Sequence, residues 1–442
     1  MYRTKDVEII SQNLDKLEDE AKTIYLNKYE PTIDESINVY KDIVEFIKDR
    51  KRIVYGGYAQ NELIRAKKET DVFYREIDLA DIEFYSPDPI GDLIDMCDMM
   101  YKKKYKYVEG KEGVHVETYK IFVNFKNYCD ITYMPKDIYD NCPNIMVDGL
   151  LLSHPHFMLI DAFRVYSDPM TSYFRLRKTF TRTTKLISYY PLDDKMIHNM
   201  IEFEENSKKD VLRFIRHNIV HDSKLIVVGQ YAFNQLMKMS QMPSTYLIDC
   251  HYIQLISSDY SKDVESITNK LKKKYPNVMK KSYYPFFQFL DRASEWYVDN
   301  VLVLRLYGSN NKCNVFRYSP KKRTNFGSFQ LLLLYCTIHY NMGKIRKNKF
   351  NEKLYGTMLT RLIKARDTYL DKNNMTVLDK TIFQEFTMEC IGEPKDLMRS
   401  SFIERANKKE QGKKMTFQYK PTGKPGKKPN FKFDNTSGNI KN

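Results

Sequence analysis

Residues 53–85 decide the fold, and they read IVYGGYAQNELIRAKKETDVFYREIDLADIEFY. The short apolar run at the start ends at the pair Gly56 and Gly57, and an apolar pattern with helical spacing follows. Because glycine has no Cβ, backbone amides at such a turn can approach a phosphate closely. This part of the sequence predicts a strand, a phosphate-binding turn and a helix.

The same stretch ends in alternating acidic and apolar residues, with Asp81 and Glu83 on either side of Ile82. In a strand, residues two apart point to the same face and lie about 7 Å apart. Two carboxylates held so close repel each other unless a cation lies between them. A pair of metal ions about 3.5–4 Å apart is a common reason for such a site. The stretch therefore predicts a site for nucleotidyl transfer.

A third carboxylate follows in the two alternating segments HVETYKIFVNF and NYCDITYMP, which predict adjacent strands. In the second segment, Asp130 points away from the face that Cys129 and Ile131 share. Asp130 could instead cap a turn, but its place after the acidic strand favours a metal ligand. Asp81, Glu83 and Asp130 are therefore the candidate metal-binding and catalytic residues.

The composition and charge of the chain limit the partners and the cellular environment that can be expected. The chain has 442 residues with 72 Lys and Arg against 57 Asp and Glu, and this excess favours a polyanionic partner, although solubility alone could explain it. Seven cysteines without metal-binding spacing predict reduced, structural thiols and no zinc site. The charged start and the shortness of the longest apolar run, residues 329–338, predict a soluble intracellular protein with no membrane partner.

A basic helix is predicted after the break at Asp168 and Pro169. Arg175, Lys178 and Arg182 fall on one stripe of it, so they could contact a triphosphate or RNA phosphates. A solvated charged face is the alternative explanation for such a stripe. The nearby His154 and His156 lack metal-ligand partners at helical spacing and are interpreted as structural.

The central unit is repeated along the chain. IVVGQYAFNQLM (226–237) resembles IVYGGYAQNELI (53–64), and LKKKY (271–275) resembles YKKKY (101–105), so the chain carries two copies, 53–135 and 226–320. In the second copy Tyr252 replaces Asp81, Gln254 replaces Glu83, and Asn314 is expected where the first copy has Asp130. A copy without the acids predicts a scaffold or an RNA-binding platform.

The C-terminal segment from residue 405 holds eleven basic and two acidic residues, with many Pro and Gly, and is predicted to be disordered. Aromatic residues among the lysines are typical of single-strand nucleic-acid binders. A merely solubilising tail is the alternative. The candidate RNA-binding residues of the tail are Lys413, Lys414, Phe417, Tyr419, Lys427 and Lys428.

A family resemblance rests on five motifs in this order: VYGGYA, ADIEFYSPD, CDITYMP, SHPHFMLID and DPMTSYFRLRK. Together they resemble the poly(A) polymerase catalytic subunits of large cytoplasmic DNA viruses, and most closely the giant-virus, mimivirus-like branch. The likeness covers roughly residues 35–190 in motif detail. Two residues depart from the usual nucleotidyltransferase pattern: Glu83 stands where many have Asp, and Tyr58 where a Ser often helps to hold phosphate.

The resemblance implies an α/β (α+β) chain of two tandem polymerase-β-type nucleotidyltransferase-like domains, the second degenerate, with a helical C-terminal extension. The expected boundaries are 1–190 for the catalytic domain, 191–325 for the degenerate domain, 326–404 for the helical extension and 405–442 for the tail. It also implies a homodimer located in the host cytoplasm, at the viral factory, with packaging into the virion as a further destination.

The implied activity is template-independent addition of AMP from ATP to RNA 3′ ends, with two Mg²⁺ or Mn²⁺ ions. Asp81, Glu83 and Asp130 would hold the ions. The phosphates would be bound by Gly56, Gly57, Tyr58, Arg175, Lys178 and Arg182. Another RNA nucleotidyltransferase, uridylyl- or CCA-adding, and a non-catalytic RNA-binding subunit are the alternatives.

Overall fold

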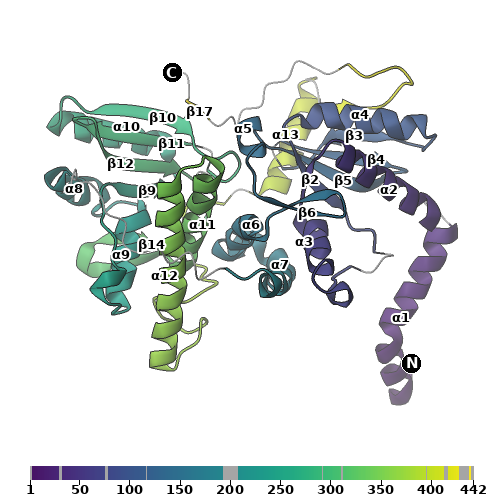
Figure 1. The fold of residues 1–442 in the computed structure, drawn as a ribbon, viewed down its shortest axis with the longest axis horizontal. Coiled ribbons are helices and arrows are strands. Elements are labelled where there is room, and N and C mark those ends of the chain that lie inside the picture. The colour runs from purple at the N-terminus through teal and green to yellow at the C-terminus, as the bar shows by residue number, and fades with distance from the viewer. Residues whose placement is uncertain are drawn as a thin grey trace. The chain divides into compact units, whose positions relative to one another are not determined.

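The chain folds into two compact units, each built around one mixed β-sheet, in a computed structural model (Figure 1). The first unit comprises Met1–Tyr133, Ile145–Leu152 and Glu404–Phe431; the second comprises Met134–Asn144, Ser153–Ile403 and Lys432–Asn442. The structure describes residues 2–28, 32–74, 78–115, 117–192, 208–290, 292–309, 312–394, 396–412, 417–427 and 438–439.

The sheet of the first unit has the strand order β16-β3-β4-β5-β2-β1-β7-β6. Its strands bury apolar side chains such as Val54, Phe84 and Ile131, and helix α4 packs against β4 and β5. The elements are α1 (Thr4–Lys28), α2 (Ile33–Asp49), β1 (Ile53–Tyr55), α3 (Gly56–Arg65), β2 (Ile82–Ser86), α4 (Pro89–Lys102), β3 (Glu109–Glu112), β4 (Thr118–Val123), β5 (Lys126–Tyr133), β6 (Asn144–Val147), β7 (Leu150–Ser153) and β16 (Gln418–Tyr419).

The sheet of the second unit has the order β15-β13-β14-β8-β9-β12-β11-β10-β17. The strands are β8 (Ile226–Val228), β9 (Ile253–Ser257), β10 (Met279–Tyr284), β11 (Ala293–Val298), β12 (Val301–Gly308), β13 (Asn314–Ser319), β14 (Thr324–Gly327), β15 (Cys390–Ile391) and β17 (Gly438–Asn439). The helices are α5 (Lys136–Tyr139), α6 (Pro155–Ser167), α7 (Pro169–Tyr189), α8 (Lys209–Ile215), α9 (Gly229–Met239), α10 (Tyr260–Lys274), α11 (Phe329–Ile345) and α12 (Lys349–Asn373), while α13 (Leu397–Glu410) runs from the second unit into the first.

The two sheets repeat one topology. The run β3-β4-β5-β2-β1-β7-β6 of the first sheet corresponds to β10-β11-β12-β9-β8-β14-β13 of the second. The strand directions agree as well: β1–β2 and β8–β9 are antiparallel, whereas β2–β5 and β9–β12 are parallel. The mixed α/β fold with two tandem units is therefore confirmed.

The boundaries of the units differ from the expected one at residue 190. Helices α6 and α7 were expected in the catalytic domain but belong to the second unit. The reason lies in packing, because the buried ring of Phe157 on α6 makes edge contacts with Phe286 and Phe289 of the second unit. Helix α6 also packs on α11, and its Phe163 packs against the core of the second unit.

The C-terminal segment is more ordered than expected. Helix α13 continues to Glu410, and strand β16 pairs antiparallel with β3, which places Tyr419 opposite Gly110. The hydroxyl of Tyr419 donates to Asp98 at 2.6 Å, and the amide of Gly426 donates to the other oxygen of that carboxylate at 3.0 Å. The expectation of disorder from residue 405 is therefore wrong for residues 405–412 and 417–427. Within the described part of the chain, no helix is long and apolar enough to span a membrane.

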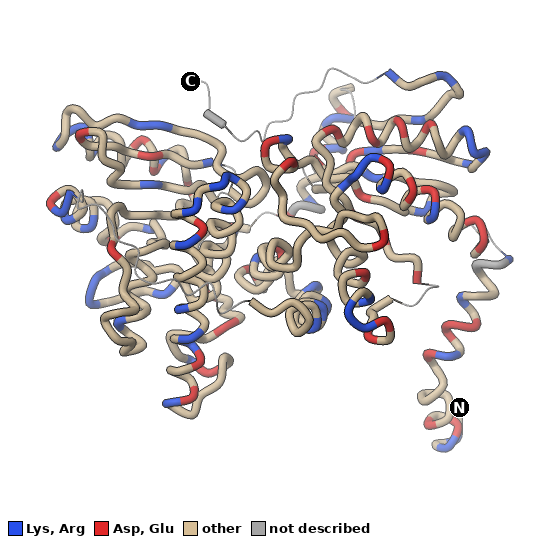
Figure 2. The backbone as a smooth tube through the Cα atoms, viewed as in Figure 1, with Lys and Arg blue, Asp and Glu red and all other residues tan. Residues whose placement is uncertain are grey.

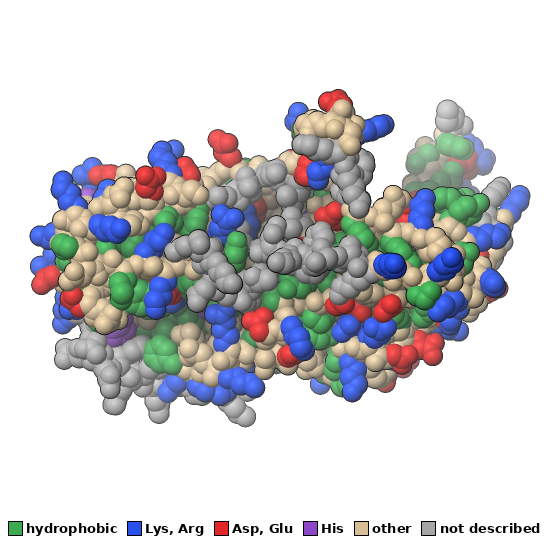
Figure 3. Space-filling view, turned by 90° about the horizontal axis from the view of Figure 1, so that it is seen from above, with side chains coloured by type: hydrophobic (Ala, Val, Ile, Leu, Met, Phe, Trp, Pro, Cys, Tyr) green, Lys and Arg blue, Asp and Glu red, His purple; other side chains and the backbone are tan. Residues whose placement is uncertain are grey.

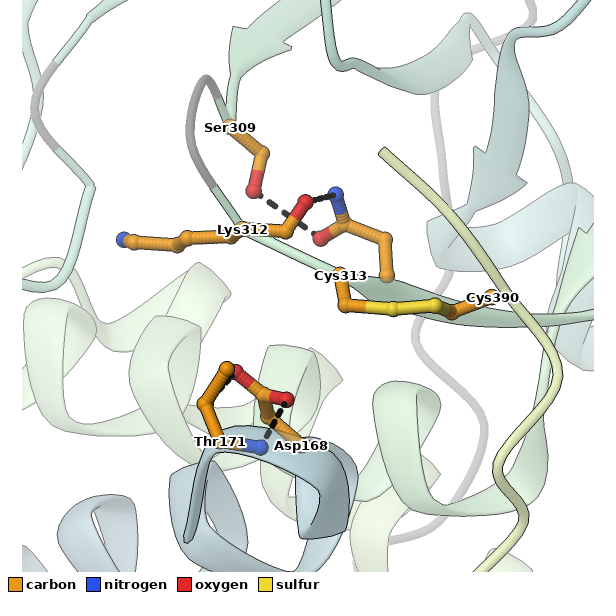
Figure 4. Close-up of a disulfide and its surroundings, with 7 residues drawn as sticks. Asp168, Thr171, Ser309, Lys312, Cys313 and Cys390 are labelled. Atoms are coloured by element: carbon orange, nitrogen blue, oxygen red, sulfur yellow. Dashed lines mark hydrogen bonds between the residues drawn. A yellow bond between two sulfur atoms is a disulfide. The ribbon is translucent and has the colours of Figure 1, made fainter. Parts of the chain in front are cut away.

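A disulfide between Cys313 and Cys390 corrects the expectation that the cysteines are all reduced (Figure 4). Strand β15 pairs antiparallel with β13, and this pairing brings the two Cα atoms to 5.4 Å. The two cysteines are 77 residues apart in sequence, so spacing alone could not indicate the bond. The remaining five cysteines are free thiols.

We predict that Cys313→Ser lowers the free energy of unfolding of the second unit by about 4 kcal/mol, because it opens a long closed loop. Urea unfolding followed by Trp296 fluorescence would measure this, since Trp296 lies fully buried in that unit. Cys336→Ser is the matched control, because Cys336 is a buried free thiol in the same unit. An equal effect of dithiothreitol on Cys313→Ser and on the unchanged protein would contradict the assignment.

Candidate active site

The turn after β1 is shaped around Glu83. Gly56 has φ +72°, a left-handed conformation that glycine adopts without strain. A Cβ at this position would lie 1.7 Å from Glu83 Oε2, so a larger residue would displace the carboxylate. The amide of Gly57, in the first turn of α3, donates to the same oxygen at 3.4 Å. The glycine turn and the acidic strand therefore form one site.

Two of the three predicted carboxylates are direct partners in one sheet, and the third immediately precedes the strand of one of them. Glu83 on β2 is the direct partner of Asp130 on the parallel strand β5, and Asp81 lies two residues before Glu83. All three carboxylates are near enough to affect the buried thiol of Cys129. Burial is the main reason that the pKa of this thiol is raised, and the negative charges of Asp130, Asp81 and Glu83 raise it further. Strand pairing thus brings together residues that are almost fifty positions apart in sequence.

Lys120 is a site residue that sequence reasoning missed. It lies on β4 directly opposite Asp130, and its Nζ is 2.7 and 2.5 Å from the two oxygens of that carboxylate. Asn127 Nδ2 donates to Asp130 as well, at 3.0 Å. A pairing of the segments KIFVNF and KNYCD across their hairpin could have shown this cross-strand ion pair.

The donor chemistry of the site fits a hard divalent cation. Carboxylate oxygens are the ligands that Mg²⁺ and Mn²⁺ prefer, and Asp81, Glu83 and Asp130 supply them from adjacent strands. Across the described residues, no three acidic, His or Cys side chains already converge as a ligand group. Lys120 lies within hydrogen-bonding distance of both oxygens of Asp130, and the remaining lone pairs of this carboxylate would be available to a cation.

The remaining predicted phosphate-binding residues lie elsewhere. Tyr58 packs its ring edge-to-face against Tyr40 of α2, with centroids 5.8 Å apart, and burial raises its pKa. Its ring therefore supports helix α3. Arg175, Lys178 and Arg182 lie on α7, which belongs to the second unit, whereas the carboxylates belong to the first.

His154 and His156 have structural roles in the second unit. His154 Nδ1 accepts from the amide of His156 at 3.2 Å and so caps helix α6. Burial, followed by the neighbouring His156 and Lys344, lowers the pKa of His154 to about 4. The ring is therefore neutral at physiological pH, as a capping acceptor must be.

The second copy places an arginine where the first has its third carboxylate. Gln254 pairs with Val228 as Glu83 pairs with Tyr55, so the predicted equivalence of Gln254 and Glu83 is confirmed. The parallel partner of Gln254 is Arg305, so Arg305 corresponds to Asp130. The expectation that Asn314 holds this place is wrong, because Asn314 begins β13, the counterpart of β6.

Around Arg305 the site is filled by hydrogen-bonded side chains. Arg305 Nε donates to Glu295 at 2.7 Å, and its Nη1 donates to the hydroxyl of Tyr252 at 3.3 Å. Gln254 Nε2 donates to the hydroxyls of Tyr335 at 2.5 Å and Tyr355 at 3.1 Å. At the positions that correspond to Asp81, Glu83 and Asp130, the second unit therefore carries Tyr252, Gln254 and Arg305, none of which is a carboxylate.

The tail residues proposed for RNA binding fall into two groups. Phe417 contacts Tyr119 edge-to-face and the hydroxyl of Tyr419 donates to Asp98, so both residues hold the tail on the first unit. Lys427 is exposed. Lys413, Lys414 and Lys428 lie outside the described residues.

Comparison with known proteins matches this architecture to one family. The chain matches the family model "Poly(A) polymerase catalytic subunit" over residues 41–172, and the model "APMV, Putative poly(A) polymerase, catalytic subunit, C-terminal" over residues 184–442. The chain belongs to the poly(A) polymerase catalytic subunit family. The crystal structure of the Megavirus polyadenylate synthase superposes with a TM-score of 0.87 at 32% identity, covering 95% of this polymerase and 86% of that chain.

Curated relatives agree with this assignment. The "Putative poly(A) polymerase catalytic subunit" of Acanthamoeba polyphaga mimivirus is 32% identical over 485 residues, 99% of this chain and 82% of the relative. The counterpart from African swine fever virus (isolate Pig/Kenya/KEN-50/1950) is 29% identical over 154 residues, 34% of the polymerase and 32% of the relative. The family resemblance is confirmed, and the polymerase is a viral polynucleotide adenylyltransferase that extends RNA without a template.

We predict that Gly56→Ala abolishes nucleotide addition, because the new Cβ displaces the Glu83 carboxylate. It should also lower the free energy of unfolding by about 2 kcal/mol through strain at the left-handed position. Primer extension and urea unfolding would measure the two effects.

Gly229→Ala is the matched control for that variant. Gly229 has φ +65°, and a Cβ there would lie 1.7 Å from Gln254 Oε1. It should cost similar stability and leave nucleotide addition intact at temperatures where the polymerase is folded. Equal loss of activity in both variants would show that Gly56 matters only for folding.

Proposed function

We propose that the polymerase transfers AMP from ATP to the 3′ end of RNA at the carboxylates of the first unit. The observation that carries the proposal is the pairing of Glu83 with Asp130 beside the Gly56 turn, which the second unit replaces with Gln254 and Arg305. An acidic edge next to a helix N-terminus suits a cation-dependent reaction on a triphosphate. Asp81, Glu83 and Asp130 would hold two Mg²⁺ or Mn²⁺ ions.

The reaction forms a bond between the RNA 3′ oxygen and the α-phosphorus of ATP and releases pyrophosphate. Bound cations supply a lowered pKa for the attacking hydroxyl and charge compensation for the triphosphate. The amide of Gly57 becomes available to a phosphate oxygen when Glu83 turns away from it. Lys120, which pairs with Asp130, supplies a positive charge beside the same edge.

The basic helix α7 offers a second set of phosphate contacts. It contains no acidic residue, and Arg175 and Lys178 are exposed. We propose that Arg175, Lys178 and Arg182 bind phosphates of ATP or of the RNA backbone. Exchanging each for Gln should weaken substrate binding more than it lowers the maximal rate.

Assembly and location complete the proposal. A homodimer, and a site of action at the viral factory in the host cytoplasm with packaging into the virion, follow from the family resemblance. Sedimentation equilibrium of the purified polymerase tests the dimer. Immunofluorescence of infected cells and proteomics of purified virions test the location.

We predict that Glu83→Gln, Asp81→Asn or Asp130→Asn each lowers nucleotide addition by at least a factor of about 10³, since each removes a charge that binds the cations. Primer extension with each of the four nucleotides would measure the rates, and calorimetric titration with Mn²⁺ would measure binding independently. Asp95→Asn is the control, because Asp95 is an exposed carboxylate of the same unit paired with Arg50.

Three outcomes would overturn the proposal. Near-normal primer extension by the double variant Asp81→Asn, Glu83→Gln would show that these carboxylates do not take part in the reaction. Preference for UTP or CTP over ATP would instead indicate another nucleotidyltransferase, and extension of no primer by the unchanged polymerase would favour a binding role.

A further inference from the structure

Two stacked aromatic rings stand exposed on the first unit. The rings of Tyr107 and Phe125 lie with centroids 4.6 Å apart at 29°. Tyr107 is 62% exposed, and Phe125, at 77%, is the most exposed large apolar side chain among the described residues. Phe125 sits in the turn between β4 and β5, and Tyr107 follows helix α4. Neither ring contributes to the core.

Phe125 occupies a backbone position that disfavours it. Asn124 and Phe125 have φ +47° and +64°, the left-handed pair of a tight hairpin turn that favours Asn, Asp and Gly. The corresponding turn of the second unit, Asp299 and Asn300, has φ +47° and +63° and carries the favoured residues. A bulky ring held in a strained and exposed position indicates a function rather than a folding role.

The turn is fixed to its surroundings. The amide of Asn124 donates to the carbonyl of Lys106 at 3.1 Å, which ties the hairpin to the loop after α4. That loop is held in turn by Asp42 of α2, which accepts from Lys103 at 2.6 Å and from Tyr105 at 2.8 Å. The ring pair is therefore a preorganised surface, which reduces the entropy that binding must cost.

Exposed lysines border the rings. Lys102, Lys104 and Lys106 are exposed, and Figure 2 shows this stretch after α4 as a blue segment of the tube. The second unit keeps a similar run, Lys272–Lys274, but has Asn277 where the first has Tyr107. On the face drawn in Figure 3, basic side chains are scattered among acidic and neutral ones, so net charge alone marks no interface. In this region, the aromatic pair is the feature that the first unit has and the second unit lacks.

The same strand connects the rings to the catalytic edge. Strand β5 runs from the turn at Phe125 to Asp130, a span of about 17 Å at the rise of a β-strand. A single strand of RNA with its 3′ end at the carboxylates could reach the rings within a few nucleotides. Exposed aromatic rings flanked by cations are the usual means of binding single strands without sequence preference.

We propose that Tyr107 and Phe125 form a stacking site for a base of single-stranded RNA upstream of the 3′ end, with Lys102, Lys104 and Lys106 along its backbone. This inference rests on the proposed function, because it requires an RNA 3′ end at the carboxylates. The site would hold the growing tail between additions and would accept any base.

The decisive variant is Phe125→Asn, which installs the residue of the second unit and suits the left-handed turn, so the fold is retained. Affinity for a long oligoadenylate, measured by fluorescence anisotropy, should fall about tenfold. Its dependence on salt should stay unchanged, because stacking releases no counterions. With this variant, the fluorescence of a 2-aminopurine base placed a few nucleotides upstream of the RNA 3′ end should no longer be quenched when the RNA binds. Single addition to a trinucleotide primer, too short to reach the rings, should continue at the normal rate.

Tyr318→Asn is the matched control, because Tyr318 is a half-exposed aromatic residue on the second unit. If the unchanged polymerase extends both primers but Phe125→Asn binds the long RNA normally, the stacking site is wrong while the proposed function stands. If neither primer is extended, the proposed function itself fails. Equal weakening by Tyr318→Asn, or a change in oligomeric mass with unchanged RNA affinity, would also overturn the stacking site.

Discussion

Each of the two sheets contains a carboxylate that is neutralised by a cationic side chain on the neighbouring strand, and the rest of the structure depends on this ion pair. A parallel pair of strands places two functional side chains side by side, and an antiparallel neighbour supplies the opposite charge. In the first unit Lys120 faces Asp130, and in the second Glu295 faces Arg305 at the corresponding positions. The charges are exchanged while the pairing is kept. Unlike charges opposite each other stabilise adjacent strands, so the pair constrains both sheets even though only one is catalytic.

The exchange of charge explains the division of work between the units. Asp130 is bound by a flexible lysine, which a divalent cation can replace. Arg305 brings a permanent cation that is already neutralised by Glu295 and hydrogen-bonded to Tyr252. Removing one member of such a buried network would leave an unpaired charge, which is strongly destabilising. Where the first unit has its carboxylate site, the second unit therefore has a rigid hydrogen-bonded network, which suits a scaffold.

Local patterns in the sequence were sufficient for the duplication and the three carboxylates, whereas the fold class came from the family resemblance. The glycine turn, the acidic alternation and the repeated segments are all short-range signals. The pattern failed where a residue's role depends on a distant partner. Lys120 and Arg305 act through cross-strand register, and Cys313 bonds Cys390 across 77 residues. The compact units do not divide at residue 190, because α6 packs onto α11 of the second unit through apolar side chains and not by order in the chain.

The pairing of β16 with β3 has a consequence for how the polymerase is made. The catalytic unit begins at the N-terminus, yet one edge of its sheet is covered by a strand near the C-terminus. The contact between Glu109 and Gln418 spans 309 residues. At ordinary elongation rates the ribosome needs roughly tens of seconds to translate that interval. During this time the edge of the sheet at β3 is unpaired in the nascent chain, and an unpaired edge strand can pair wrongly with other chains. This edge of the sheet is therefore completed only after β16 has been translated, long after the rest of the first sheet.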